Sequence, residues 1–306
     1  MSRKQPGIQK RQNEAEMQLL IIAQHFTYKC AKKWVLFLFI VCVIFPIGIN
    51  IALYFAINDI HTGVLALTSI SLLFIGDFIS KEIERVKKKA AMLQQKFDLH
   101  VFRLDIASGI DDNIIAEQQE KYKNRDWYRK ANWYANYESM DIDKAIFYSQ
   151  RENIDWTKNI ANRYRYFLVG ITIIALLTFG LNLVLNNSSV VKMLSILMTA
   201  IPLIIYAKTG YYKIKQDNEN LARIIKFADE IQSNINEISP EKLKNSTYIL
   251  QITIYKFRQE KYLIPDWFEN RYYKHLQAIE NRKAGQRSQL EKKRTVTKKN
   301  SDKKRA

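Results

Sequence analysis

The stretch WVLFLFIVCVIFPIGINIALYFA, residues 34–56, contains no charged side chain. About 20 apolar residues are enough to cross the hydrocarbon of a bilayer as a helix, so this stretch predicts one transmembrane span. Similar stretches follow it along the chain, separated by the polar turns Asn58–Gly63 and Asn186–Ser189. The sequence therefore predicts an all-α membrane protein with two hairpins, whose four transmembrane helices cover residues 34–56, 60–79, 167–185 and 190–207.

Positive charge is excluded from both hairpins. Of the 48 lysines and arginines, only Lys192 falls within them. The rest lie in residues 1–33, 80–166 and 208–306, which an even number of crossings places on one side. The positive-inside rule assigns that side to the cytoplasm. We expect a multi-pass membrane protein with both termini in the cytoplasm.

The two ends of the chain are polar. Residues 1–33 offer no apolar segment ahead of the first span, so we expect no cleaved signal peptide. Cys30 and Cys42 are the only cysteines, which predicts neither a disulfide framework nor a metal site, and we expect no cofactor. Residues 283–306 are rich in lysine and arginine without apolar periodicity, and they predict a disordered basic tail.

The spans continue into amphipathic helices. Ile83, Ala90 and Phe97 belong to an apolar stripe with helical spacing, with Lys87 to Lys89 expected on wet faces. Residues 214–238 follow a heptad pattern interrupted by Asp217. These two stalks need a partner surface. We expect the insert 80–166 and the segment 208–282 to build one mainly helical cytoplasmic domain.

Several residues predict where the cytoplasmic helices begin. Ser239 followed by Pro240 is a helix-start signature. Pro265 forces an extended step, after which Asp266 is placed to cap a last helix. Asp111 and Asp112 favour helix capping over a catalytic carboxylate pair. Further helices are expected over residues 113–123 and 141–166.

Catalysis has little support in the sequence. The four histidines are scattered, and no phosphate-binding loop, nucleophile elbow or cluster of metal ligands is present. We therefore expect a protein that is not an enzyme.

The stretch NRDWYRKANWYANY, residues 124–137, interleaves aromatic with basic and amide side chains. Aromatic faces stack on nucleobases, and guanidinium groups hold phosphates. The alternative is that these rings pack a small helical core or lie at the membrane interface. Residues 151–156 and 255–268 have the same character and the same alternative, with Asp155 and Asp266 as caps. The candidate ligand-binding residues are Arg125, Trp127, Arg129, Asn132, Trp133, Tyr134, Arg151, Asn153, Trp156, Arg258 and Trp267.

Polar side chains also occur inside the spans, where each must find a partner. They line a pore between subunits, or they simply join helices. These candidate pore-lining residues are Asn50, Thr178, Asn182, Ser195 and Thr199.

The order of short motifs around the spans resembles the SMODS-associating four-transmembrane effector family. The resemblance covers about residues 14–280. Its carriers are Phe97–Phe102 after the second span, Asn132–Tyr134 in the insert, Arg151–Trp156 before the third span, and Arg258 followed by Ile264–Phe268. Where members of the family tend to have Pro or Trp after the Phe-Asp motif, this chain has Asp105-Ile106-Ala107, which leaves the local turn open.

This resemblance implies the killing arm of an anti-phage signalling system. A cyclic di- or trinucleotide from a SMODS-type nucleotidyltransferase is expected to bind the cytoplasmic part, and the membrane part is expected to disrupt the lipid bilayer of the bacterial inner membrane. We hypothesise that the ligand binds between subunits of a homo-oligomer. Two alternatives stay open: a polybasic anchor that recruits nucleic acid or anionic lipid through the tail, and an ungated channel.

Overall fold

The computed structural model describes residues 7–55, 59–106, 109–125, 127–128, 130–137, 140–185 and 190–272, with scattered positions up to 289. Within these residues the regular structure is helical throughout. The elements are α1 (Ile8–Gln12), α2 (Ala15–Phe39), the π-helical turn η1 (Ile40–Ile44), α3 (Phe45–Phe55), α4 (Asp59–Phe102), α5 (Asp112–Tyr122), α6 (Ile142–Leu185), α7 (Val190–Ser233) and α8 (Pro240–Glu260).

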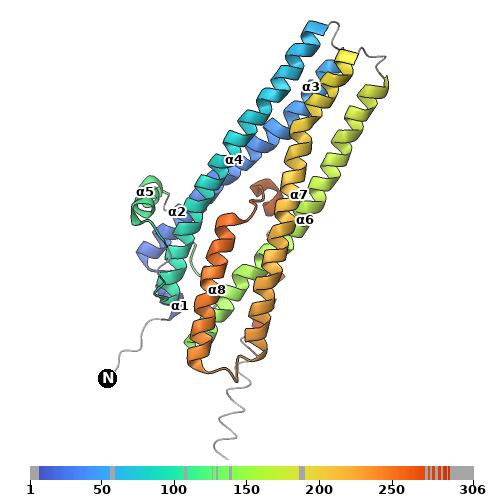
Figure 1. The fold of residues 1–306 in the computed structure, drawn as a ribbon. Coiled ribbons are helices and arrows are strands. Elements are labelled where there is room, and N and C mark those ends of the chain that lie inside the picture. Colours follow the sequence, from blue (N-terminus) through green and yellow to red (C-terminus); the bar gives the residue numbers. More distant parts are fainter. Residues whose placement is uncertain are drawn as a thin grey trace, which may run out of the picture.

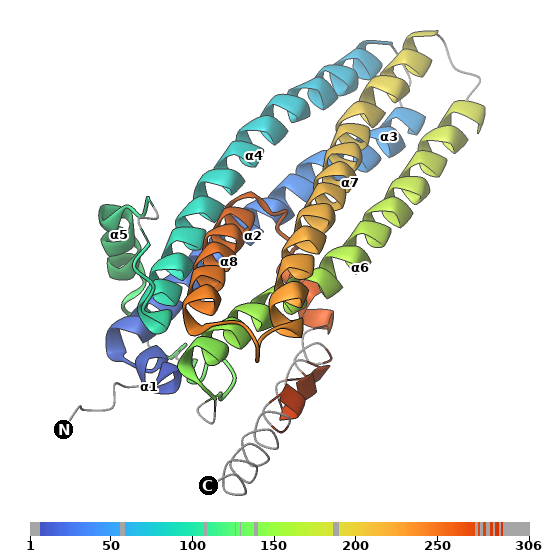
Figure 2. The same cartoon turned by 60° about the horizontal axis from the view of Figure 1, so that its bottom comes forward.

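Four long rods run side by side along the molecule: α2 with η1 and α3, α4, α6 and α7 (Figure 1). The ends of α3 and α6 and the starts of α4 and α7 lie together at one end, which we call the outer end. The spans next to it form the apolar half, and the rest forms the charged half. In the charged half α8 packs against α4, α6 and α7, while α5 lies on the outer side of α2 (Figure 2).

All four predicted transmembrane helices are confirmed as helices long and apolar enough to cross a membrane. None of the three rods α4, α6 and α7 is interrupted where its span ends. The predicted boundaries after residues 79, 166 and 207 therefore fall inside continuous helices of 44 residues each. They mark a change of surface from apolar to charged, and the backbone passes through them unbroken.

Two sequence expectations about the first hairpin are wrong. The turn expected at residues 58–63 is shorter, because α4 already begins at Asp59 and buries Thr62 against the bundle. The N-terminal segment is not simply polar: α2 begins at Ala15, and Met17 and Ile21 are buried in the core of the charged half. The turn expected at residues 186–189 lies outside the described residues.

The first rod contains a π-helical turn, η1, just before Pro46. A π-turn shifts the register of the helix and often marks a functional position. Opposite it, a Cβ added to Gly76 of α4 would lie 3.0 Å from Cys42 Sγ, so the two helices approach closely there.

The stripes of the two stalks are confirmed as core. Ala90 and Phe97 on α4, and Leu221 and Ala228 on α7, are at most 2% exposed. Asp217, the interruption, is buried and accepts a hydrogen bond from the Tyr262 backbone amide at 2.5 Å. Lys87 was wrongly expected on a wet face. It is 4% exposed and donates to the carbonyl oxygens of Glu260 and Lys261, at 3.2 Å each, which ties α4 to the end of α8.

The predicted helix starts are largely confirmed. Ser239 caps α8 by accepting from the Lys242 amide, and Asp111 caps α5. Residues 266–272 are helical after Pro265, but Pro265 supplies the capping carbonyl, and the Asp266 carboxylate binds Lys32 instead at 2.8 Å. Most of the basic tail lies outside the described residues.

Candidate ligand-binding cleft

The predicted ligand residues do not form one site. Most of them divide among a buried network in the charged half, the side of α6 next to α7, and the side of the bundle where α5 packs. Arg129 and the side chain of Trp156 lie outside the described residues. Each of the three places has a different chemical character.

The first place is a buried polar network around Asp98 of α4, which is completely enclosed. Arg258 Nη1 of α8 lies 2.6 Å from Asp98 Oδ2, and the Tyr134 hydroxyl donates to Oδ1. Asn153 Nδ2 of α6 donates to the Tyr134 hydroxyl at 3.1 Å, and Gln251 Nε2 donates to Asp98 at 3.0 Å. Helix α8 and the loop before α6, which are far apart in the sequence, therefore both bind one carboxylate of α4.

Burial alone would lower the pKa of the Arg258 guanidinium, but the adjacent Asp98 carboxylate outweighs it, and the pKa is raised. Arg258 therefore remains a cation in the core. Tyr134, Asn153 and Arg258 are thus engaged with other groups of the same chain. Their position favours the alternative interpretation, in which these motif residues hold the helices of the charged half in register.

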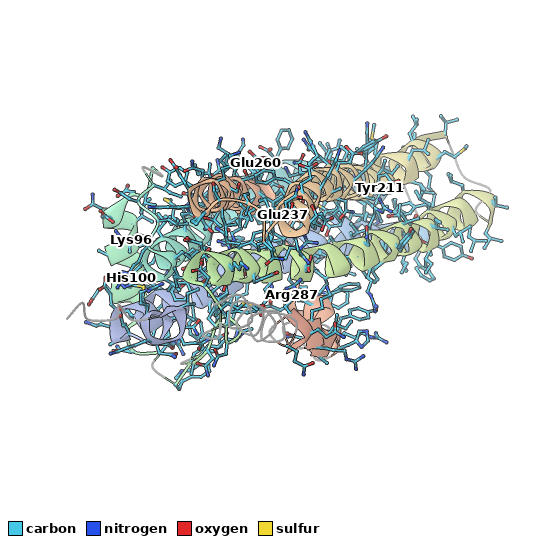
Figure 3. All side chains as sticks on the ribbon, turned by 90° about the horizontal axis from the view of Figure 1, so that it is seen from below. Lys96, His100, Tyr211, Glu237, Glu260 and Arg287 are labelled. Atoms are coloured by element: carbon cyan, nitrogen blue, oxygen red, sulfur yellow. The ribbon has the colours of Figure 1, made fainter. Side chains whose placement is uncertain are left out.

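The second place is the side of α6 next to α7. Arg151 pairs with Asp155 at 3.2 Å on the same helix and with Asp229 of α7 at 2.7 Å. Asp155 also contacts Lys283 at 3.4 Å and Arg287 at 3.2 Å, so its expected role as a helix cap is wrong. In Figure 3, Arg287 lies beside the bundle on a different side from Glu260 of α8.

Two predicted aromatic residues pack against the bundle away from the cleft described next. Trp133 meets Phe97 edge-on at 6.2 Å, with Lys130 over its ring, and Trp267 meets Phe167 at 5.3 Å. Asn132 has a positive φ of 57° and exchanges hydrogen bonds with Asn13, both at 3.2 Å. These two hydrogen bonds fix the middle of the loop between α5 and α6 against the end of α1.

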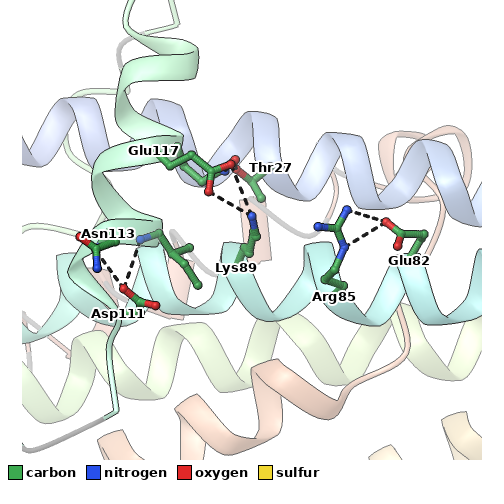
Figure 4. A network of polar contacts seen from close by, with 9 residues as sticks. Thr27, Glu82, Arg85, Lys89, Asp111, Asn113 and Glu117 are labelled. Carbon is green, nitrogen blue, oxygen red and sulfur yellow. Dashed lines mark hydrogen bonds and ion pairs between the residues drawn. The ribbon is translucent and has the colours of Figure 1, made fainter.

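The third place is a cleft of about 110 Å³ between α2, α4 and α5. Helix α5 crosses the other two, and Thr27 Oγ1 of α2 donates to Gln118 of α5 at 3.3 Å. Figure 4 shows Glu117 projecting from α5 to Lys89 of α4, at 3.2 Å. The lining residues are Thr27, Cys30, Arg85, Val86, Lys89, Glu117, Gln118, Lys121 and Tyr122.

Positive charge exceeds negative charge in the cleft lining. Arg85, Lys89 and Lys121 face a single lining carboxylate, Glu117. Arg85 is exposed and pairs with Glu82 of its own helix at 2.7 Å, outside the lining. Such exposed pairs are weak, so a multiply charged anion can replace either carboxylate at little cost. The cleft therefore suits a phosphodiester.

An aromatic group extends the cleft toward the predicted residues Arg125 and Trp127. The Phe26 ring of α2 lies between Tyr122, stacked at 5.6 Å, and Trp127, edge-on at 5.7 Å. The Arg125 guanidinium lies 5.5 Å over the same ring. Trp127 is 70% exposed, so it offers an open face on which a base can stack.

Comparison with protein families agrees with this architecture. Residues 6–286 match the model of the SMODS-associating 4TM effector domain. The chain belongs to this effector family. No curated protein and no solved structure matches it. Membership in this effector family associates the chain with signalling by SMODS nucleotidyltransferases. It also agrees with the four helices that are long and apolar enough to cross a membrane.

Sequence reasoning missed most of the basic side of the cleft. Arg85 and Lys89 are four residues apart, so they lie on one face of α4 beside its apolar stripe. That spacing was visible, but the contact with α5 was not, because α5 follows in the chain only after a break. Of the predicted residues, Arg125 and Trp127 lie closest to this face.

Proposed function

We propose that this effector abolishes the barrier of the bacterial inner membrane when a cyclic di- or trinucleotide binds its cytoplasmic half. The cleft between α2, α4 and α5 is the binding site. Its cations hold the phosphates, while Trp127 stacks on a base. A volume of about 110 Å³ suits part of such a ligand, and the remainder extends over the aromatic group.

The continuity of the rods is the observation that carries this proposal. Helix α4 supplies Arg85 and Lys89 to the cleft and then runs without a break to the outer end. Helix α2 supplies Thr27 and Cys30 and leads directly into η1 and α3. A ligand that changes how α5 packs on these helices therefore acts directly on the first transmembrane hairpin.

The energetics favour several sites acting together. Moving a closed equilibrium from 1:99 to 99:1 requires about 5.5 kcal/mol of differential binding. A ligand that displaces Glu117 from Lys89 gains only part of this free energy, because the cleft is partly exposed. We therefore propose a homo-oligomer in which several cleft sites bias one transition, with the cationic segments on the cytoplasmic side.

The test uses purified protein in liposomes loaded with potassium. Cyclic di-AMP, cyclic di-GMP, cyclic GMP–AMP and cyclic tri-AMP are added in turn, and potassium efflux is recorded. We expect efflux with one nucleotide, and we expect Lys89→Glu and Trp127→Ala to abolish it.

Lys96→Glu is the matched control, because Lys96 lies on the same helix and pairs with Asp112 outside the cleft lining. Figure 3 shows Lys96 beside His100, far along the bundle from Tyr211. Retained gating in Lys89→Glu, or equal loss in Lys96→Glu, contradicts the cleft. Binding of the nucleotide without any efflux contradicts the proposed function.

A further inference from the structure

The buried asparagine, serine and threonine side chains described in the apolar half are segregated by depth. Asn182 Nδ2 of α6 donates to Asn50 Oδ1 of α3 at 2.8 Å, and Ser69 of α4 donates to Thr199 of α7 at 3.2 Å. All four residues are at most 5% exposed, as are Thr62 and Ser195. They therefore face the inside of one chain's own bundle, and all belong to its outer part.

Below this polar part the buried side chains are apolar as far as Tyr206, whose hydroxyl lies 3.3 Å from that of Tyr262. At about 1.5 Å per residue, Thr199 lies about 13 Å from the start of α7 and Leu203 about 20 Å. Leu72 and Val43 lie at the depth of Leu203, counted from the outer ends of their own helices. Leu168 lies deeper by the same count, about 25 Å from the outer end of α6, but it borders one space with Val43 and Leu203. We call Val43, Leu72, Leu168 and Leu203 the gate layer, and each is at most 6% exposed.

The gate layer is tightly closed. The space between Val43, Leu168 and Leu203, which Thr172 and Tyr206 also line, has no room for a water molecule. The Thr172 hydroxyl donates to the Leu168 carbonyl oxygen of its own helix at 2.7 Å. Narrow apolar constrictions of this kind block water and ions because the permeant must give up its hydration. The two buried polar pairs described in the apolar half, Asn182 with Asn50 and Ser69 with Thr199, lie above the gate layer.

The helices are irregular at the level of the gate layer. Val43 lies within η1, with Pro46 one turn away, and Leu203 directly follows Pro202 inside α7. Gly76 of α4 lies one turn below Leu72 and faces Cys42 of η1. Sharp bends in helices occur mainly at prolines and π-turns. Two of the four rods therefore have a bending point at this depth, and α4 approaches one of them closely.

We propose that water and small ions cross through the middle of each subunit's own helix bundle, and that the gate layer is its closed gate. This inference rests on the proposed function, since it names where the membrane barrier opens. The asparagine, serine and threonine side chains line the path above the gate. Lys192, which donates to the Tyr54 carbonyl oxygen at 3.4 Å, places a cation at the outer mouth.

The experiment compares two variants. One introduces asparagine in the gate layer, and the other introduces asparagine at a neighbouring position that faces lipid. Leu203→Asn changes a residue that is 1% exposed, while Ile204→Asn changes its neighbour, which is 44% exposed toward lipid. Liposomes are loaded with a halide-sensitive dye, or separately with carboxyfluorescein. We expect Leu203→Asn to pass chloride without nucleotide, Ile204→Asn to stay closed, and carboxyfluorescein to be retained by both.

A second pair guards against misfolding of the first: Leu72→Asn in the gate and Phe74→Asn, 75% exposed, as its control. Folding of each variant is checked by circular dichroism and gel filtration. Chloride retention by both folded gate variants overturns the inference. So does nucleotide-triggered release of carboxyfluorescein by the unmodified protein, which would place the opening between subunits or in the lipid while supporting the proposed function. Nucleotide-independent leak in the gate variants, without any nucleotide response, would support the gate and contradict the ligand.

Discussion

The two halves of the bundle fasten their helices with polar contacts of different kinds. In the charged half, α4 and α8 share the enclosed ion pair of Asp98 and Arg258. In the apolar half, the buried contacts between rods are neutral, as between Asn50 and Asn182. A buried charge that loses its partner is very costly, whereas a neutral amide can turn to another group. The charged half is therefore held in one register, and the apolar half is free to change its own.

Removing one member of the ion pair should have the largest effect. In Arg258→Met the Asp98 carboxylate stays buried without its cation, which we expect to cost about 3–5 kcal/mol of unfolding free energy. Thermal unfolding of the protein in detergent, followed by circular dichroism, measures the loss.

The double variant Asp98→Leu with Arg258→Met is the decisive control. It removes both charges, and apolar replacement of a buried pair is often neutral. We expect it to regain most of the stability lost in the single variant. Equal losses in the single and double variants would mean that the pair contributes through packing alone, and the contrast between the halves would disappear.

The sequence predicted features that repeat along a helix or depend on neighbouring residues. Leu221 and Ala228 follow a heptad, and Ser239 precedes a proline, so both predictions were confirmed. Composition could not separate Tyr134, which is enclosed beside Asp98, from Trp127, which is exposed beside the cleft. That distinction depends on how α4, α6 and α8 meet, and these helices are far apart in the chain.

The membrane part shows the same limit. Apolar length located all four spans, and it also selected Asn50 and Asn182 as exceptions. Whether such residues face another subunit or their own bundle depends on helix rotation. The structure buries Asn50, Asn182, Ser195 and Thr199 within one chain, while Thr178 is half-buried and donates to the Ala175 carbonyl oxygen. In our proposal a path through each subunit's own bundle therefore takes the place of the pore between subunits that these residues were expected to line.

Breaking the neutral pair should have a smaller effect than breaking the charged one. Asn182→Leu removes both hydrogen bonds to Asn50, and pairs of this kind contribute about 0.6–1.7 kcal/mol in membrane proteins. Thr178→Val is the matched control, because its hydroxyl bonds only within α6 in this structure. Unfolding in increasing dodecyl sulfate compares the two variants. A loss in Asn182→Leu as large as that in Arg258→Met would make the halves alike.

Lowering the pH should reduce the stability of the charged half alone. This effect should be smaller than those of Arg258→Met and Asn182→Leu. His25 of α2 stacks on Tyr128 at 3.8 Å, and burial, assisted by Lys29, lowers its pKa to about 4. Between that value and the ordinary value near 6.5 the unfolded chain binds more protons than the folded one. Stability should therefore fall as the pH drops from about 6.5 to 4.

His25→Gln should reduce this dependence, because its side chain does not titrate. The comparison must be made against the unmodified protein at each pH. Burial raises the pKa of Asp143 and Asp217, so these carboxyl groups oppose the trend at the acidic end. The difference between His25→Gln and the unmodified protein isolates the imidazole, and the same difference should persist in the Asn182→Leu background. If Asn182→Leu changed it, protonation beside the cleft would be coupled to the membrane helices, and the two halves would respond to acid as one unit.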